Sequence, residues 1–436
     1  MGKWRAGRED SVLLRDMTQR LIEASTVRPA QRIAGVENTT GRSLLTSGYS
    51  PEDSAAPPAF RTRDPAWVAE SGLIPPEDVW GWLTLMAETM HGPKRLRVAG
   101  GGIVLPYSVP DHIHMDGTPV YYPATCASVE TQAPPGGKYP PHDDQYWPTL
   151  TAYAYAKMTD DWQAFGRTVR TPMGEAPLSE VCELTHNSFP VDRNTQTCIA
   201  SDEMEEHIVD WGYADSVTKT GKLLFPSLLR LESALKLAEL FERNGDDSRA
   251  AEYERQASAM LVSIPAVFYE ENQRGDAWLI SATGLGDKPD VWGSAFAVYR
   301  GFVDGPLAEA IARTLLRGFR ETTTVAEGQV RHIPTSDGFW QTSSAPEGTG
   351  QNGAYWGYAT GWYICALTLV DEAAAAEMFS EFMDHLRSTW SDDLKACAWE
   401  CVNPELDHRG APGCLTTIAL PYACLKEKGL LDLPDD

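Results

Sequence analysis

The chain lacks long hydrophobic runs. Its first thirty residues contain no continuous apolar stretch of the kind that forms a signal peptide. The longest uninterrupted apolar runs, such as YICALTLV at 363–370, are far shorter than the roughly 20 residues of a membrane-spanning helix. We therefore expect a soluble, cytoplasmic protein that does not bind membranes.

Positive charge is also scarce. The 436 residues include 37 Lys and Arg against 61 Asp and Glu, which gives a formal net charge of −24. No block of Lys or Arg reverses this balance locally. Because an acidic surface repels phosphate groups, we exclude nucleic acid and anionic lipid as partners.

Cysteines are few and scattered, eight in the whole chain, which is typical of reduced thiols in a cytosolic protein. Cys397 and Cys401 are four residues apart, but Cys414 and Cys424 do not repeat that spacing, so we expect no zinc site. The His-x-His pair within 111–116 is interpreted as a turn that lines a cleft. We therefore expect neither a metal nor an organic cofactor.

Strand-like alternation and fixed-period repeats are rare, whereas helical periodicity recurs along the chain. In 216–244, for example, Leu228, Leu231 and Leu235 form part of an apolar stripe that ends at the turn NGDD. The predicted helices are 9–24, 64–72, 76–90, 143–157, 160–170, 216–244, 247–268, 290–302, 306–320, 353–370, 371–389 and 413–427.

Twelve helices in successive hairpins predict an all-α fold, an (α/α)6 toroid of six helical pairs. Segments 290–302 and 353–370 are apolar nearly all round, as inner helices are, whereas 306–320 and 371–389 are one-sided. Without a fixed repeat, an α-solenoid is the less favoured alternative. We expect 1–60 to form an N-terminal helix and extended lead-in, packed on a single barrel domain.

That barrel domain is expected to span 61–436. Long polar loops, predicted at 92–142, 171–215, 321–352 and 391–412, fall on the same side of the hairpins and would build a funnel at one end of the ring.

Short polar clusters precede several predicted inner helices. They contain Asp64, Asp144, Asp215 and Asn352, and each is accompanied by aromatic residues. Asp and Asn are favoured helix N-caps, so capping alone could explain any one of them. Together they indicate a sugar site, since hydroxyls bind to carboxylates and amides while the sugar ring packs on aromatic faces. The candidate sugar contacts are Asp64, Trp67, His112, Asp144, Gln145, Trp211, Trp292, Gln351, Asn352, Tyr355, Trp356 and Trp399.

Glu400, in the stretch ACAWECVNPE, differs from these residues because no helix begins directly after it. The apolar neighbours predict a half-buried carboxylate, which is either paired with a cation or used in chemistry. A catalytic role requires a second acid, for which Asp215 is the first choice and Asp210 the second. We assign no role to Glu347.

Residues 60–425 resemble the six-hairpin glycosidases, in the group of processing α-glucosidase, trehalase, glucosylglycerate hydrolase and alkaline invertase. Five segments carry the resemblance in order: RDPAWVAESGLIPPEDVWGWL, VPDHIHMDGTPVYYP, WGYADSVTKTGKLL, GQNGAYWGYATGWY and AWECVNPELDHRGAPGCLTTIAL. The resemblance implies an exo-acting, inverting enzyme that hydrolyses an α-glucoside-like bond in a small saccharide or glycoside. It also implies that Asp215 is the general acid and Glu400 the general base.

The sequence departs from this family at two points. The acid segment of the family usually reads Gly-Trp-Asp, whereas here Gly212-Tyr213-Ala214 precedes Asp215 and Asp210 lies just upstream, so both acids stay open. Because only about sixty residues precede the first of these segments, we expect no counterpart of the β-sandwich found before the barrel in several relatives. A sugar epimerase or isomerase with a catalytic pair of histidines, and a non-catalytic sugar-binding toroid, are the alternatives. The sequence leaves the oligomeric state undetermined.

Overall fold

The computed structural model describes residues 4–47, 58–98, 101–122, 140–189, 191, 199–202, 210–391, 394 and 397–434. Within these ranges it contains twelve α-helices. They are α1 (Arg8–Ser25), α2 (Arg63–Ala69), α3 (Pro76–Thr89), α4 (Trp147–Thr159), α5 (Leu178–His186), α6 (Leu224–Arg243), α7 (Asp247–Phe268), α8 (Val291–Arg300), α9 (Gly305–Arg320), α10 (Thr360–Leu367), α11 (Glu372–Thr389) and α12 (Leu415–Glu427).

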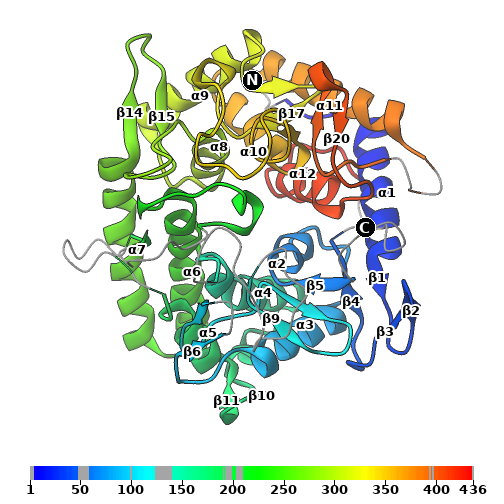
Figure 1. Cartoon of the computed structure of the whole chain (residues 1–436), viewed down its shortest axis with the longest axis vertical. Coiled ribbons are helices and arrows are strands. Elements are labelled where there is room, and N and C mark those ends of the chain that lie inside the picture. Colours follow the sequence, from blue (N-terminus) through cyan, green and yellow to red (C-terminus); the bar gives the residue numbers. More distant parts are fainter. Residues whose placement is uncertain are drawn as a thin grey trace.

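The helices form two concentric rings (Figure 1). The even-numbered helices α2 to α12 each contact the next one, and α12 contacts α2, which closes the inner ring. The odd-numbered helices pack outside it: α3 on α4, α5 on α4 and α6, α7 on α6, α9 on α8, α11 on α10, and α1 on α12. The predicted (α/α)6 toroid is therefore confirmed. The expected domain boundary near residue 60 stays a prediction.

Most predicted helices agree with the observed ones, and 247–268 coincides with α7. The helix predicted at 160–170 is wrong. Asp161 caps a short 3-10 helix there, and the β-branched run after it forms a strand, Thr168–Thr171. Conversely, α5 lies inside the loop predicted at 171–215.

Short strands connect the helices, and most are only two or three residues long. They are β1 (Thr26–Val27), β2 (Arg32–Ile33), β3 (Val36–Glu37), β4 (Leu44–Leu45), β5 (Ala59–Arg61), β6 (Leu96–Arg97), β7 (Ile103–Val104), β8 (His112–His114), β9 (Pro119–Val120), β10 (Thr168–Thr171), β11 (Gly174–Pro177), β12 (Ser201–Asp202), β13 (Gly221–Lys222), β14 (Tyr269–Glu271), β15 (Ala277–Leu279), β16 (Val325–Ala326), β17 (Gln329–Arg331), β18 (Tyr355–Trp356), β19 (Val402–Asn403) and β20 (His408–Arg409).

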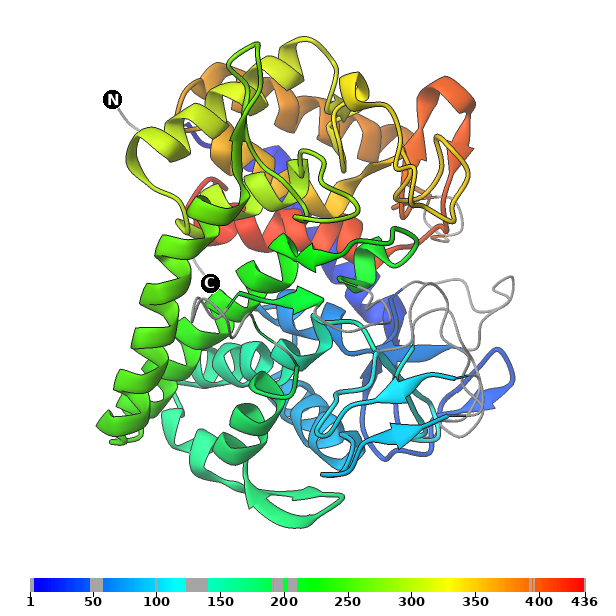
Figure 2. The same ribbon diagram turned by 60° about the vertical axis from the view of Figure 1, so that its left-hand side comes forward.

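Two sheets bring distant loops together. The antiparallel sheet β16-β17-β18-β19-β20 pairs Tyr355 with Val402, so the loop before α10 lies beside the loop before α12. The sheet β5-β8-β9 places Arg61 opposite His112. Figure 2 shows the long loops and short strands gathered mainly at one end of the helices. This sheet pairing is what positions the polar residues described below.

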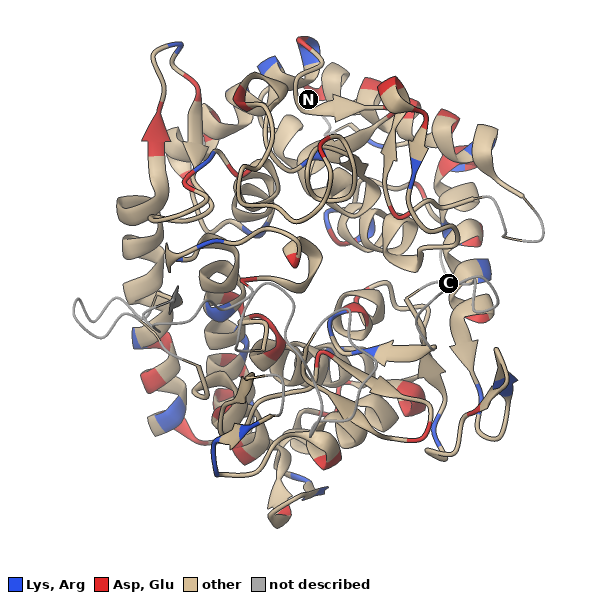
Figure 3. Cartoon of the chain, viewed as in Figure 1, with Lys and Arg blue, Asp and Glu red and all other residues tan. Residues whose placement is uncertain are grey.

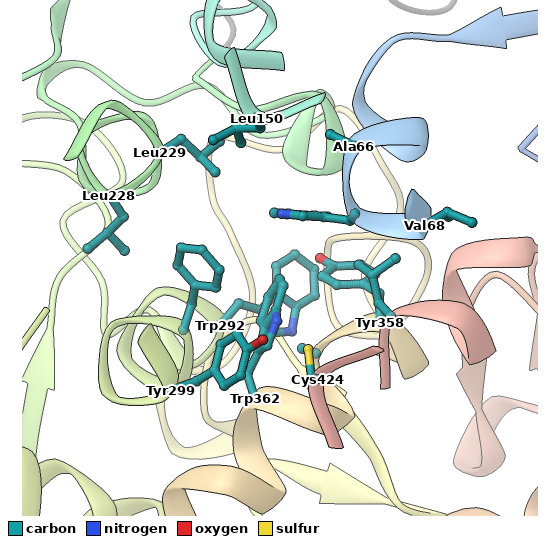
Figure 4. Close-up of a cluster of buried hydrophobic side chains, with 14 of the residues drawn as sticks. Ala66, Val68, Leu150, Leu228, Leu229, Trp292, Tyr299, Tyr358, Trp362 and Cys424 are labelled. Atoms are coloured by element: carbon teal, nitrogen blue, oxygen red, sulfur yellow. The ribbon is translucent and has the colours of Figure 1, made fainter. Parts of the chain in front are cut away.

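The centre of the inner ring is filled with side chains. Figure 4 shows Trp292, Tyr358 and Trp362 packed among aliphatic residues of the surrounding helices. The ring of Trp67 lies edge-on to those of Trp147 and Trp362, with centroids 5.0 and 5.4 Å apart. Because this core leaves no open channel of its own, functional surfaces belong at the two ends of the ring.

The outer surface carries acidic residues on many helices and loops, with Lys and Arg interspersed among them (Figure 3). In the part of the chain that the structure describes, no helix combines the length and the apolar character needed to cross a bilayer.

Candidate active site

Four polar segments meet where the inner helices begin. Asp64 lies in the first turn of α2, and Asp215 follows the 3-10 turn Gly212–Ala214 ahead of α6. Trp356 precedes α10, and Glu400 precedes α12. Because inner helices of the ring start at the same end, segments far apart in sequence come together in space.

Arg63 is the centre of this end of the ring. It is the first residue of α2, and its side chain is only 3% exposed. Its guanidinium pairs closely with Asp111 and lies 3.6 Å from Asp143 and 3.5 Å from Asp144. One buried cation therefore joins the start of α2, the loop before β8 and the turn before α4.

Arg63 leaves no room for a side chain at position 212. A Cβ atom at Gly212 would lie 1.9 Å from Nη2 of Arg63, closer than any side chain can approach. The amide of Gly212 also donates a hydrogen bond to Asp143, 3.0 Å away. Only glycine can therefore bring the Asp215 segment this close to the buried charge.

The carboxylate of Asp111 also lies near the charge of a second arginine, Arg61. Nδ1 of His112 lies 2.6 Å from one carboxylate oxygen, and the partly exposed Arg61 lies 3.6 Å from it. Burial alone would raise the pKa of Asp111, but Arg63, His112 and Arg61 hold that pKa well below its ordinary value. Asp111 is therefore a permanent anion that fixes the cations around it.

Asp143 and Asp144 are both fully buried but have different surroundings. Asp143 accepts hydrogen bonds from Gly212 and from the indole of Trp147, at 3.0 and 3.3 Å. Neither oxygen of Asp144 accepts a hydrogen bond from the described residues. Burial raises the pKa of Asp143 to about 7 and that of Asp144 well above its ordinary value. This pair therefore holds protons more readily than ordinary carboxylates and is not a fixed double anion.

Asp215 is half-buried and oriented by an amide. Nε2 of Gln351 donates to its Oδ1 at 3.1 Å, and the hydroxyl of Ser216 holds Gln351 through a 2.7 Å hydrogen bond. The pKa of Asp215 is raised to about 6, chiefly by burial; Arg63 and Arg61 oppose the rise, while Asp111 and, to the smallest extent, Glu400 add to it. Asp215 therefore lies within electrostatic reach of Glu400 and remains protonated in weakly acidic solution.

Glu400 is half-buried in a loop held by backbone hydrogen bonds. Its amide donates to Ala411 at 2.8 Å, and Gly410 donates to Cys401 at 2.8 Å. Burial raises the pKa of its carboxyl, Arg61 lowers it, and Asp64 raises it. No salt bridge within 4.0 Å connects this carboxylate to a described Lys or Arg. The salt-bridge explanation for Glu400 is therefore not supported.

Asp64 does not cap a helix through its side chain. Its two carboxylate oxygens instead accept one hydrogen bond each, from Ser47 and Tyr213. The ring of Tyr213 stacks on Trp67, with centroids 6.1 Å apart and an angle of 12°. The backbone carbonyl of Ser47 in turn accepts a hydrogen bond from the amide of Leu415, the first residue of α12. Asp64 thus keeps its position while further lone pairs of its carboxylate remain available.

Three predicted residues are fully buried. Asp210 is fully buried and pairs with the equally buried Lys219 at 2.8 Å. Trp211 exposes no surface and stacks on Phe225 with centroids 3.5 Å apart. Trp292 exposes none either and donates its indole N–H to a backbone carbonyl. These two rings belong to the core, which corrects the prediction that they contact sugar.

Asn352, Trp356 and Tyr355 were predicted to contact sugar, but each makes a structural contact with the loops around the site. The amide of Asn352 accepts from the Trp340 backbone at 2.7 Å and donates to Ala345 at 2.8 Å. Trp356 donates its indole N–H to the backbone at 3.1 Å. Tyr355 is buried in the sheet pairing with Val402. These contacts shape the wall of the site, and Asn352 has both amide atoms engaged.

Nε2 of Gln145 and the indole Nε1 of Trp399 are buried and have no hydrogen-bond partner among the described residues. Oε1 of Gln145 accepts from Val109 and Ser188, but its buried Nε2 has no partner there. Trp399 is half-buried, with Arg409 over its ring at 5.4 Å. Glu347 is exposed in its loop and stays unassigned.

Two histidines of the predicted funnel loops, His332 and His112, lie beside buried carboxylates. His332 is stacked on Trp292 at 3.9 Å beside Asp290, and burial lowers its pKa to about 4. His112 is bound to Asp111. Within the described residues, no group of three or more His, Cys, Asp or Glu is arranged to hold a metal ion.

The sequence analysis missed the residues that organise the site. Arg61 and Arg63 lie in the quoted segment RTRDPAW, but only Asp64 and Trp67 were selected from it. Two arginines within three residues, in a chain so poor in positive charge, were the available signal. Asp143 had a signal too, as the neighbour of Asp144.

Comparisons with known proteins were made for the whole chain. No family model and no curated protein matches it. Among solved structures it is similar to the glucoamylase of Saccharomycopsis fibuligera, at 11% identity and a TM-score of 0.58, covering 99% of this chain and 98% of that one. The family 15 glucoamylase of Hypocrea jecorina gives 11% identity and a TM-score of 0.59, covering 98% and 74%.

A third similar structure is a metal-independent α-mannosidase of Streptococcus pneumoniae. It has 12% identity and a TM-score of 0.57, covering 96% of this chain and 94% of that one. Likeness at this low identity shows the fold: the chain is a six-hairpin toroid of the type found in these proteins.

Asp144→Asn tests the electrostatics of the Arg63 cluster. A carboxyl whose pKa is raised in the folded state stabilises the fold at low pH, and this contribution is lost as pH rises from the unfolded value of about 3.9 towards the folded one. The variant should therefore be more stable than the parent in alkaline solution, and the difference should shrink as pH falls towards 4.

The measurement is the urea midpoint at a series of pH values, with Asp287→Asn as the matched substitution at an exposed carboxylate. A stability difference for Asp144→Asn that does not change with pH would contradict this account of the cluster.

Proposed function

We propose that the protein is an inverting glycoside hydrolase that removes a terminal sugar from a small α-glucoside-like saccharide. What supports the proposal is that Asp215 and Glu400 both precede inner helices, α6 and α12, at one end of the ring, that both are half-buried, and that arginine charge acts on each carboxyl. Two carboxyl groups with unequal surroundings are what acid–base hydrolysis of a glycosidic bond requires.

Asp215 is the proposed general acid. With its pKa raised to about 6, the carboxyl retains a proton that it can donate to the leaving oxygen. Because Gln351 engages Oδ1, the second oxygen is free to point that proton at the substrate. Asp210 is the weaker candidate, since Lys219 lies against it at 2.8 Å and favours its ionised form.

Glu400 is the proposed general base. In the ionised form it would take a proton from the water that attacks the opposite face of the sugar ring. Inverting enzymes separate the two carboxyls by about 6.5–9.5 Å to leave room for that water. Burial raises the pKa of Glu400 and Arg61 opposes that rise, so the arginine favours the ionised form that a base needs.

Asp64 is the proposed contact for the hydroxyls of the terminal sugar. Ser47 and Tyr213 hold its carboxylate, so its remaining lone pairs can accept hydroxyl hydrogen bonds. Trp399 offers a half-buried ring beside Glu400, suited to packing on a sugar face. The mechanism assigns no step to a metal or an organic cofactor.

The comparisons support the reaction class. Two of the similar structures are glucoamylases, and the third is an α-mannosidase whose substrate complex contains α-1,6-mannobiose. The α-mannosidase acts on an α-linked sugar by its name, which agrees with the α-glucoside-like bond proposed here.

The proposal predicts hydrolysis with inversion. A panel of aryl α- and β-glycosides and disaccharides, followed by NMR, should show an α-glycoside cleaved to the β-sugar as first product. Retained configuration would rule out the inverting pair. An epimerase would release no second sugar, and a binding protein would show calorimetric binding without turnover over days.

The two acids should differ in their response to the leaving group. Glu400→Gln should lower kcat by about 10²–10⁴-fold on every substrate, because the base is needed whatever leaves. Asp215→Asn should lower it similarly on disaccharides but far less on dinitrophenyl glycosides, since that group departs with little protonation.

Asp210→Asn is the comparison variant for the acid. It leaves Lys219 unpaired in the core, so it should reduce stability and should not discriminate between leaving groups. If Asp210→Asn, and not Asp215→Asn, keeps most of its activity on dinitrophenyl glycosides while losing it on disaccharides, the acid assignment is reversed.

The pH profile of kcat/KM should be a narrow bell. Its alkaline limb should fall near pH 6, where Asp215 loses its proton, and its acidic limb should follow protonation of Glu400. Arg61 lowers both pKa values, so Arg61→Gln should move both limbs to higher pH. An alkaline limb above pH 8 in the parent enzyme would contradict Asp215 as acid.

A further inference from the structure

Arg61 has N–H donors that no described residue uses. It is the last residue of β5 (Figure 1), and its side chain is 36% exposed. A guanidinium carries five N–H donors in a planar fork. None of those of Arg61 donates a hydrogen bond to a residue that the structure describes. These donors are therefore available to a molecule that enters the polar end of the ring.

The nearest carboxylate does not engage these donors. Asp111 lies 3.6 Å from Nη1 of Arg61, beyond hydrogen-bonding distance. The same oxygen of Asp111 lies 2.6 Å from Nδ1 of His112, and its other oxygen pairs closely with Arg63. Arg63, in contrast, is only 3% exposed and faces three carboxyl groups. The protein encloses one arginine and leaves the other accessible.

Arg61 is within electrostatic reach of both proposed catalytic carboxyls. Burial raises the pKa of Asp215 and that of Glu400, and the charge of Arg61 opposes the rise in each. Arg61 is the largest charge acting on Glu400, and it acts on Asp215 more strongly than Glu400 does. Since the scissile bond lies between the acid and the base, Arg61 borders the space that the substrate would occupy.

Exposure indicates which part of the substrate Arg61 would contact. Asp64, the proposed contact of the terminal sugar, is 3% exposed, whereas Arg61, three residues earlier, is 36% exposed. In a pocket that takes the terminal sugar first, the leaving group lies nearer to solvent. Charge agrees with this placement, because a cation opposes the oxocarbenium character of the terminal ring but favours negative charge that develops on the leaving oxygen.

We propose that Arg61 binds the leaving-group side of the substrate, where it donates paired hydrogen bonds to oxygen atoms of the second sugar of a disaccharide. Arg61 is thereby a specificity-determining residue, which favours saccharides over glycosides whose leaving group carries no hydroxyl. Two neighbouring oxygens fit the planar fork of a guanidinium, and lysine cannot reproduce that geometry. The inference rests on the proposed function, since it takes Asp215 and Glu400 as acid and base.

The test compares maltose with phenyl α-D-glucoside, which share the terminal sugar and differ in the leaving group. The kcat/KM of Arg61→Gln is measured at its own pH optimum, because loss of the charge also changes the pKa of the two carboxyls. The loss on maltose should be at least tenfold greater than the loss on phenyl α-D-glucoside. Equal losses on the two substrates would mean that Arg61 acts only through the carboxyls, which would overturn the proposal.

Arg61→Lys separates the charge from the shape of the side chain. Lysine keeps the positive charge, so the pH profile should stay close to that of the parent. It lacks the planar fork, so the loss on maltose should remain at least fivefold greater than the loss on phenyl α-D-glucoside. Parental activity on maltose in this variant would contradict the paired hydrogen bonds.

Arg313→Gln is the matched control. Arg313 lies on the outer helix α9, and its side chain is 62% exposed. The control should keep the parental kcat/KM on both substrates. A selective loss on maltose in this control as well would show that the effect does not belong to Arg61.

Calorimetric titration with maltose distinguishes this inference from the glycosidase proposal. If the parent hydrolyses both substrates and Arg61→Gln loses activity equally on them, the role of Arg61 is wrong and the glycosidase proposal stands. If the parent hydrolyses neither but Arg61→Gln binds maltose at least tenfold more weakly, Arg61 is a sugar contact and the glycosidase proposal is wrong. Absence of both hydrolysis and maltose binding in the parent would overturn both.

Discussion

The burial of Arg63 is the constraint on which the polar end of the ring depends. A guanidinium deprived of water is stable only if carboxylates surround it, and Asp111, Asp143 and Asp144 do so from two different loops. Asp111 carries the permanent charge that balances Arg63, and Asp143 and Asp144 lie 3.6 and 3.5 Å from the same guanidinium, so both loops are tied to α2. The orientation of the Asp215 segment follows from this, because Gly212 fits directly against the same guanidinium.

Closure of the inner ring explains why the ends differ chemically. With the aromatic core filling the centre, backbone N–H groups face one end and carbonyl groups the other. The first end gathers carboxylates around arginine. At the second end, Glu70 and Glu232 are paired with Lys236 and Arg300 near the carbonyl termini. A single architecture thus creates two ends of opposite backbone polarity.

Periodicity was enough to predict the ring because its helices are long and one-sided or apolar throughout, as in 247–268 and 290–302. It failed at 160–170, where a single aspartate cap and a β-branched run overrode a helical pattern. Sequence position identified Asp64 and Asp215 as polar residues where inner helices begin, and Glu400 as a carboxylate among apolar neighbours with no helix directly after it. It could not identify Trp292 as core, because an indole at the start of a helix looks alike whether it faces solvent or stacks on His332.

The choice between Asp215 and Asp210 shows what spacing alone leaves open. Both precede α6 by a few residues, and both are desolvated, which raises both pKa values. Lys219 distinguishes them, since it supplies Asp210 with a fixed counter-ion at 2.8 Å. A carboxylate paired so closely cannot release and recover a proton without exposing a buried ammonium. Asp215, held through the neutral amide of Gln351, can change its charge while its orientation is kept.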